Sequence, residues 1–158
     1  MRLTRRWLGL IGALLLLLGG CASAPSSEEQ EAHREAVEDI LSEPLGAEAY
    51  AETERCLSTH QYRSVEVLDA QHVLFRGPGD RAWLNTLRRR CIGLRRGDTL
   101  QFRLRDNRVC SLDTFEAVDG FFWFWDRTSG VCSLGDFAPV TPEQVEAIRA
   151  ALADADDD

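Results

Sequence analysis

Apolar and polar positions alternate in short segments along the middle of the chain. Residues 62–68 and 71–76 predict two strands that form a hairpin around Asp69-Ala70. The Gly-Pro-Gly-Asp turn at residues 77–80 leads into residues 81–87, which predict a third strand. Short strands with turns about every 8–12 residues are typical of a small antiparallel sheet or barrel.

Two further stretches extend this predicted sheet. Residues 99–105 alternate between apolar and polar positions and predict a strand. Asp106-Asn107 then turns the chain into residues 108–112, which gives a second predicted hairpin. Residues 131–137 predict the last strand.

A helical pattern precedes the predicted strands. Residues 28–42 suit a helix, with Ser27 and Gln30 as its capping box and Pro44 beyond its end. The apolar stripe of this helix is thin. The helix therefore either docks on the domain or extends from it as a solvated arm.

A second helix follows the strands. Thr141 is the expected N-cap, Pro142 suits the first helical position, and Gln144 completes a capping box. The apolar face consists of Val145, Ile148 and Leu152, which should pack on the sheet. The predicted fold class is therefore α+β, mainly β, with a small antiparallel sheet or barrel and a helix at each end.

The first twenty residues have the pattern of a signal peptide. Arg2, Arg5 and Arg6 form a positive start, and residues 8–18 are an uncharged apolar run. A helix needs about 20 apolar residues to cross a bilayer, so this run is too short to be a stable span. We expect it to be removed after export.

The residues after the apolar run indicate lipidation. Leu18-Gly19-Gly20-Cys21 resembles the lipobox of bacterial lipoproteins, in which the cysteine thiol accepts a diacylglyceryl group. The rival cleavage site at residues 22–24 is followed by Pro25, which obstructs an extended backbone. We therefore expect acyl chains such as palmitate on Cys21. The resemblance to Gram-negative lipoproteins further implies that Ala22 after the cysteine, in place of Asp, directs the protein to the outer membrane on its periplasmic side.

These patterns divide the chain into four regions. They are the signal peptide at 1–20, a lipidated tether and acidic helix at 21–51, a β domain with its C-terminal helix at 52–153, and an acidic tail at 154–158.

All 18 basic residues are arginine, and 26 residues are acidic, so the formal net charge is −8. Removing the first twenty residues takes away three arginines and no acid, which makes the charge −11. An acidic chain of this kind is not expected to bind nucleic acid.

Four cysteines remain after Cys21: Cys56, Cys91, Cys110 and Cys132. In an exported chain, four cysteines predict two disulfides, with three possible connectivities. Their wide spacing argues against a Cys₄ zinc site, which uses close pairs. We prefer the pairs Cys56–Cys91 and Cys110–Cys132, because shorter loops close at a lower entropic cost.

Arginine is concentrated in the second half of the chain. Arg88, Arg89, Arg90, Arg95, Arg96, Arg103 and Arg105 are candidate anion-binding residues, with Arg108 close to them. Guanidinium groups bind phosphate and carboxylate through two parallel hydrogen bonds. The alternative is an ordinary solvated face, since every surface cation of this chain is an arginine.

Phe121, Trp123 and Trp125 alternate along the most apolar segment outside the signal peptide. They are candidates for apolar contact, either within a core, at a lipid interface or with a partner protein.

Motifs for catalysis, metal binding or cofactor binding are missing from the sequence. His33, His60 and His72 lack metal-ligand spacing, and no nucleophile motif or phosphate loop occurs. We therefore expect no cofactor and no metal, and we expect that the protein is not an enzyme. The alternative is an enzyme whose site is assembled in space from His60 or His72 and an Asp.

Several motifs also resemble a family of small proteobacterial lipoproteins of unknown function. The matching segments, besides the four cysteines, are Cys56-Leu57, Tyr62-Arg63-Ser64-Val65, Trp83-Leu84-Asn85-Thr86-Leu87, Asp113-Thr114-Phe115, Cys132-Ser133-Leu134-Gly135 and Phe137-Ala138-Pro139-Val140. The resemblance implies an exported domain with paired cysteines, and it supplies no activity or site residue.

The expected function is that of a membrane-anchored periplasmic lipoprotein with a non-catalytic binding or envelope-accessory domain. The expected partners are the membrane, through the lipid, and an envelope protein or anionic envelope polymer. An alternative role is that of an envelope assembly factor acting through the arginine-rich face. The ligand, the oligomeric state and the functional or structural role of the arginine cluster and aromatic run stay open.

Overall fold

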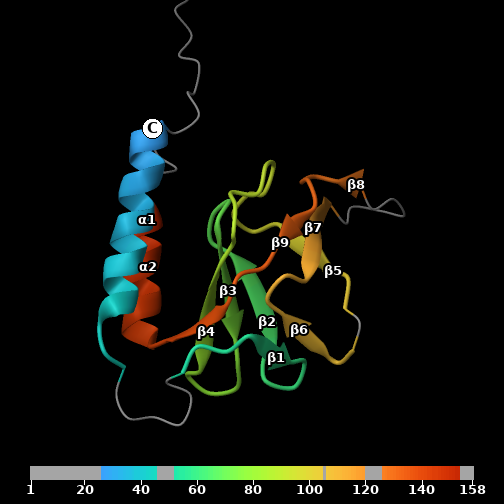
Figure 1. Cartoon of the computed structure of the whole chain (residues 1–158), viewed down its shortest axis with the longest axis horizontal. Helices are drawn as coiled ribbons and strands as arrows, with labels where there is room; N and C mark the ends of the chain where they lie inside the picture. Colours follow the sequence, from blue (N-terminus) through green and yellow to red (C-terminus); the bar gives the residue numbers. More distant parts are fainter. Residues whose placement is uncertain (1–25, 46–51, 105, 120–125, 154–158) are drawn as a thin grey trace, which may run out of the picture.

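The computed structural model describes residues 26–45, 52–104, 106–119 and 126–153 (Figure 1). The helices are α1 (Ser27–Ser42) and α2 (Pro142–Ala153). The strands are β1 (Cys56–Ser58), β2 (Ser64–Val67), β3 (His72–Arg76), β4 (Ala82–Thr86), β5 (Thr99–Phe102), β6 (Arg108–Cys110), β7 (Thr114–Asp119), β8 (Asp126–Arg127), β9 (Cys132–Ser133) and β10 (Phe137–Val140). Cys21, Arg105 and the aromatic positions Phe121, Trp123 and Trp125 lie outside the described residues.

The elements form three layers. The central layer is a four-stranded antiparallel sheet in the order β10-β4-β3-β2. The helix pair covers one face, and the strands β5, β7, β8 and β9 with the β1–β6 pair lie on the other side (Figure 1). This arrangement confirms the predicted α+β class and its mainly antiparallel strands.

The central sheet is buried on both faces. Val73, Phe75 and Trp83 point into the core shared with the outer strands, whereas Leu74 and Leu84 pack in the core under the helices. Alternating side chains of one strand thus belong to two different cores. Strands β3 and β4 consequently appear in the sequence as nearly continuous apolar runs.

Helix α1 docks on the domain, which settles the choice that its thin apolar stripe left open. Val37 is fully buried, and Ile40 and Leu41 pack against the same core. The Gln144 side chain of α2 donates from Nε2 to the carbonyl oxygen of Ile40 at 3.0 Å. The two helices run antiparallel, so α1 begins at the end of the molecule where α2 ends (Figure 1).

The helix caps agree closely with the expected signals. Thr141 Oγ1 accepts from the Gln144 backbone at 3.2 Å, and Gln144 Oε1 accepts from the Thr141 backbone at 3.0 Å, which confirms the predicted box. At α1 the box lies one residue earlier than expected, between Ser26 and Glu29. Three residues after Ser26 stands Glu29, and three residues after Ser27 stands Gln30, so both serines fit a capping box in the sequence.

The first predicted hairpin is confirmed and the second is wrong. β2 and β3 pair as the expected antiparallel hairpin, and Val67 faces Val73, so the connection is one residue longer than the predicted Asp69-Ala70 turn. In contrast, β5 pairs with β7, and β6 pairs with β1. Around the predicted turn, the described residues contain a single isolated bridge, which joins Asp106 and Arg108. The pairing of β6 with β1 buries Leu57 and Val109 together in the core, which a local hairpin would not achieve.

The preferred disulfide pairing is also wrong. The bonds join Cys56 to Cys110 and Cys91 to Cys132, at sequence separations of 54 and 41 residues. Cys56 lies directly opposite Cys110 in the β1–β6 register. The strand pairing therefore brings distant cysteines together, and it overrides the small entropic preference for shorter loops.

The last predicted strand is divided in two. The side chain of Asn85 donates to the Gly135 carbonyl oxygen at 2.8 Å and accepts from the Gly135 backbone at 2.9 Å. A side chain on residue 135 would collide with the Thr86 carbonyl oxygen. Gly135 thus lets the chain pass closely over β4, and β9 and β10 separate at this point.

No helix among the described ranges is long and apolar enough to cross a membrane.

Candidate functional site

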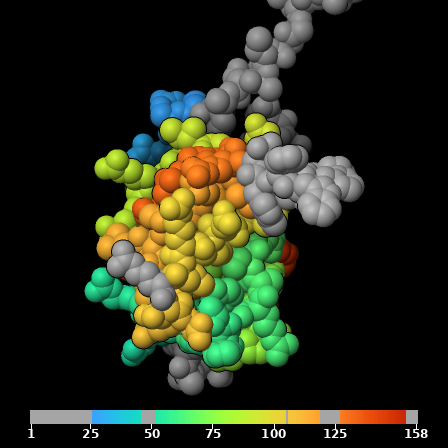
Figure 2. Space-filling view, turned by 90° about the vertical axis from the view of Figure 1, so that its right-hand side faces the viewer, coloured from blue at the N-terminus to red at the C-terminus, as the bar shows by residue number. Residues whose placement is uncertain are grey.

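The strongest candidate site is a hollow next to the Cys91–Cys132 disulfide, which we call the arginine groove. Its volume is about 760 Å³. Its lining consists of Arg88, Arg89, Arg90, Ile92, Leu112, Gly130, Val131, Cys132 and Ser133. Figure 2 shows residues 126–133, in orange, close to the yellow-green segment that follows β4.

The backbone on both sides of the three arginines is held in place. The N–H groups of Leu87 and Cys91 donate to the carbonyl oxygens of Gln71 and Ala70, each at 2.8 Å. The residues between Leu87 and Cys91 therefore bulge away from the core. All three arginine side chains are exposed as a result.

The two walls of the groove are joined to each other. The Gly130 backbone donates to the Ile92 carbonyl oxygen at 3.1 Å, and Cys91 is bonded to Cys132. Gly93 has φ +85°, and a Cβ there would lie 2.5 Å from the Thr128 carbonyl oxygen. A glycine is needed at this position for both reasons. The groove is consequently a fixed surface feature.

Three aliphatic side chains around the groove are exposed to solvent. Ile92 is 87% exposed, Val131 60% and Leu112 54%. Leu112 has φ +79°, in a turn where Asp113 N–H donates to the Cys110 carbonyl oxygen at 3.0 Å. The third position of such a turn normally holds Gly or Asn, and another L-residue costs roughly 1–2 kcal/mol. The turn thus presents an exposed leucine at a position where its backbone is strained.

The predicted arginine cluster is distributed over several places. Arg88, Arg89 and Arg90 lie together in the arginine groove. Arg96 donates from Nη2 to the Leu152 carbonyl oxygen at 3.3 Å, near the end of α2. Arg103 is 3.2 Å from the buried carboxylate of Glu116. The cluster in sequence is therefore not one cluster in space.

Glu116 is bracketed by two arginines. Its side chain is buried on β7, with Arg103 on one carboxylate oxygen and Arg127 on the other at 3.0 Å. A buried carboxylate requires such compensation. Arg103 has a structural partner, unlike the three groove arginines, for which no ion pair is found among the described residues.

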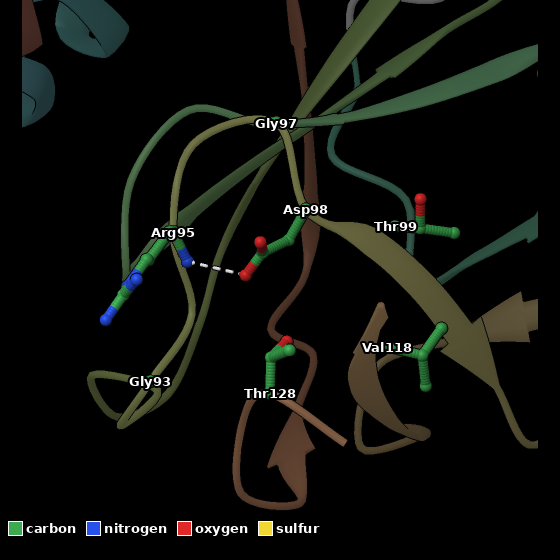
Figure 3. Close-up of a pocket in the computed structure, with 7 residues that line it drawn as sticks. All are labelled: Gly93, Arg95, Gly97, Asp98, Thr99, Val118 and Thr128. Carbon is green, nitrogen blue, oxygen red and sulfur yellow. Dashed lines mark hydrogen bonds between the residues drawn. The ribbon is translucent and has the colours of Figure 1, made fainter. Parts of the chain in front are cut away.

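Arg95 lines a second hollow of about 520 Å³, together with Gly93, Gly97 and Asp98 (Figure 3). The backbone N–H of Arg95 donates to Asp98 Oδ2 at 2.8 Å, while the guanidinium points away from that carboxylate (Figure 3). Asp98 is therefore already engaged in shaping the turn. The arginine groove, with three adjacent cations and three aliphatic residues, is better suited to binding a ligand.

His72 and Asp69 form the histidine–carboxylate pair that the enzyme alternative requires. His72 Nδ1 lies 3.0 Å from Asp69 Oδ1, which also accepts from the backbones of Gln71 at 2.7 Å and His72 at 2.6 Å. His72 is buried, its Nε2 has no hydrogen-bond partner among the described residues, and it lines neither hollow. His60, by contrast, is exposed on the segment after β1.

The His72–Asp69 pair shapes the turn at residues 69–72, and this turn accepts hydrogen bonds from the backbone on both sides of the groove arginines. Burial by itself raises the pKa of the Asp69 carboxyl, but the hydrogen bonds from His72 and from the Gln71 backbone outweigh it. The pKa therefore lies below its ordinary value. The ionised Asp69 holds residues 69–72 in place, and the carbonyl groups of Ala70 and Gln71 in turn hold Cys91 and Leu87.

We expect Asp69→Asn to lower stability by about 1–2 kcal/mol at pH 7, because hydrogen bonds to a charged acceptor are lost. A carboxyl with a lowered folded pKa contributes stability that is present above pH 4 and is lost as the pH falls through the folded value. The difference between parent and variant should therefore shrink toward pH 3. Urea unfolding between pH 3 and 7 measures this.

Asp80→Asn, in an exposed turn, is the control that should retain the parental profile. A constant difference at every pH would contradict the role of the ionised carboxyl.

A family model matches residues 4–156, nearly the whole chain. The chain belongs to DUF6491, a family of unknown function. No curated protein and no solved structure matches the chain. The function of this DUF6491 protein is therefore inferred from the residues and geometry of its candidate site.

The described part of the DUF6491 chain holds no cluster of three or more His, Cys, Asp or Glu residues that suits a metal. The sequence predicts the three groove arginines as candidate residues but does not indicate Ile92, Leu112 and Val131. Each of these is a single apolar residue between turn residues or cysteines, without a periodic pattern that would indicate its exposure.

Proposed function

We propose that the chain is an exported envelope lipoprotein, held in the outer membrane by acyl chains on Cys21, and that its folded part is a non-catalytic binding domain. The lipobox at residues 18–21 supports the anchor. The two disulfides support an oxidising compartment, because such bonds are rare in the cytosol.

The observation that carries the binding role is the arginine groove. Three exposed arginines without acidic partners among the described residues lie beside three exposed aliphatic side chains. Guanidinium groups favour phosphate or carboxylate, and the aliphatic residues favour an apolar neighbour. We therefore propose an anionic envelope component as the ligand.

The hydrogen-bonded His72–Asp69 pair is the observation that favours the enzyme alternative. The pair is buried, and Asp69 already accepts two backbone hydrogen bonds within its turn. A general base needs access to a substrate proton. We propose a positioning role for the pair, in support of the groove.

Two variants test the proposal. In cells, Cys21→Ala should lack acyl chains by intact mass and should move from the membrane fraction to the soluble fraction. The purified Cys21→Ala protein should still bind isolated envelope fragments, and the triple variant R88Q/R89Q/R90Q should reduce that binding at least tenfold. Hydrogen bonds to charged groups contribute about 1.5–3 kcal/mol each, which sets this lower limit.

The matched control is R34Q/R63Q/R108Q. It removes the same charge from three exposed arginines, one on α1, one directly before β2 and one on β6, and it should bind like the parent. Equal loss in both triple variants would reduce the effect to net charge and would overturn the groove. An unmodified Cys21 in the native protein would overturn the anchor.

A further inference from the structure

The arginine groove lies at the end of the molecule where the described chain begins. Helix α1 starts at Ser27, at the same end as the segment after β4 and the strands β8 and β9 (Figures 1 and 2). The Arg96–Leu152 hydrogen bond independently ties the segment between β4 and β5 to the last turn of α2. Because the helices are antiparallel, that turn lies beside the start of α1.

The chain before α1 limits how far this end can lie from a lipid anchor. Cys21 stands five positions before Ser26. Five residues reach at most about 18 Å even when fully extended. With acyl chains on Cys21, the end that carries the groove is therefore the end next to the bilayer.

The chemistry of the groove suits a phospholipid surface. The three arginines can bind phosphate oxygens, while Ile92, Leu112 and Val131 can enter the layer between head groups and acyl chains. The rest of the acidic chain is repelled by an anionic surface. The groove is thus a cationic face on a molecule that is otherwise acidic. An anionic membrane surface therefore favours the orientation in which the groove faces the bilayer.

We propose that the arginine groove is a membrane-docking face, which binds the phosphate head groups of the bilayer that holds the Cys21 anchor. This inference rests on the proposed lipid anchor and names the ligand of the proposed site. Leu112 fits this role, because its turn of positive φ presents an exposed aliphatic side chain at the groove, where it would contact lipid. Each arginine near an anionic surface contributes roughly a fivefold preference, so three contribute roughly a hundredfold.

The test uses the full acylated protein in vesicles of phosphatidylethanolamine with phosphatidylglycerol, compared with phosphatidylcholine alone. Amide hydrogen exchange is measured for residues 88–93 and 130–133. In the anionic vesicles, exchange in both segments should slow at least tenfold. R88Q/R89Q/R90Q should abolish this protection, whereas R34Q/R63Q/R108Q should retain it.

Two single variants separate docking from folding. Ile92→Gln changes a side chain that is almost fully exposed, and Leu112→Asn places a residue that tolerates positive φ in the strained turn. Both should leave urea unfolding unchanged or slightly improved. Both should nevertheless weaken the protection by anionic vesicles severalfold.

The outcomes distinguish the docking proposal from the anchor. Acylated protein with equal exchange in both kinds of vesicle overturns docking alone. Protection by inorganic phosphate in detergent, without protection by vesicles, shows a soluble-anion site and also overturns docking. An intact mass without acyl groups overturns the anchor, and the docking proposal that rests on it fails with it.

Discussion

Removing the Cys56–Cys110 disulfide by C56A/C110A is expected to lower the free energy of unfolding by about 4 kcal/mol. The bond closes 54 residues, and the loop-entropy relation gives this value for a loop of that size. Domains of this kind are stable by about 5–15 kcal/mol in total, so the loss is a large fraction. Equilibrium urea unfolding of the purified protein measures it.

C91A/C132A is the matched comparison, since its loop of 41 residues predicts nearly the same loss. The two variants should differ in function, because Cys132 lines the arginine groove whereas the other bond lies between β1 and β6. Only C91A/C132A should weaken envelope binding. A C56A/C110A protein within 1 kcal/mol of the parent would contradict the expected contribution of the bond.

Replacing Phe75 by alanine is expected to cost about 3–5 kcal/mol, because it leaves a cavity between the two β layers. Phe75 is fully buried on β3. Its ring centroid lies 5.1 Å from that of Phe137, 5.3 Å from that of Tyr62 and 6.0 Å from that of Phe102. Phe75 therefore contacts rings from both β layers, and its loss affects the packing of both layers.

Phe75→Leu keeps most of the volume and should cost about half as much or less, whereas Leu104→Ala, at an exposed position, should stay within about 0.5 kcal/mol of the parent. Thermal and urea unfolding together give these values. A Phe75→Ala protein as stable as the Leu104→Ala control would contradict the central position of the ring.

Local signals in the sequence predicted local structure well. The hairpin of β2 and β3 depends on alternation around a two-residue turn signal, and the start of α2 depends on residues three positions apart. Such interactions lie within a few residues of one another. Propensity and capping rules therefore capture them without knowledge of the rest of the fold.

The pairings that failed depend on residues far apart in the sequence. Strand β7 was not predicted at all, although it is the partner of β5, β8 and β9. Without it, β5 was assigned to its neighbour in sequence, which is the usual arrangement for consecutive strands. The wrong disulfide pairing has the same origin. The three-residue strand β1 pairs with β6, and this long-range pairing places Cys56 opposite Cys110.

The candidate site was predicted in part for a similar reason. A run of three arginines is visible in the sequence, but its separation from Arg96 and Arg103 depends on the buried Glu116 and on the end of α2. The three aliphatic residues of the groove come from three separate segments: Ile92 and Leu112 lie in turns, and Val131 directly precedes β9. Their meeting requires the Cys91–Cys132 bond and the strained turn at Leu112.

The two disulfides overlap along the chain, since one spans residues 56–110 and the other spans 91–132. A protease that cuts any one peptide bond between Cys56 and Cys132 therefore leaves both pieces in a single covalent molecule. Two separate loops, as Cys56–Cys91 and Cys110–Cys132 would have formed, leave an unprotected stretch between them where one cut releases a fragment. The interleaved bonds close that gap, so a nicked copy of the domain keeps all of its parts.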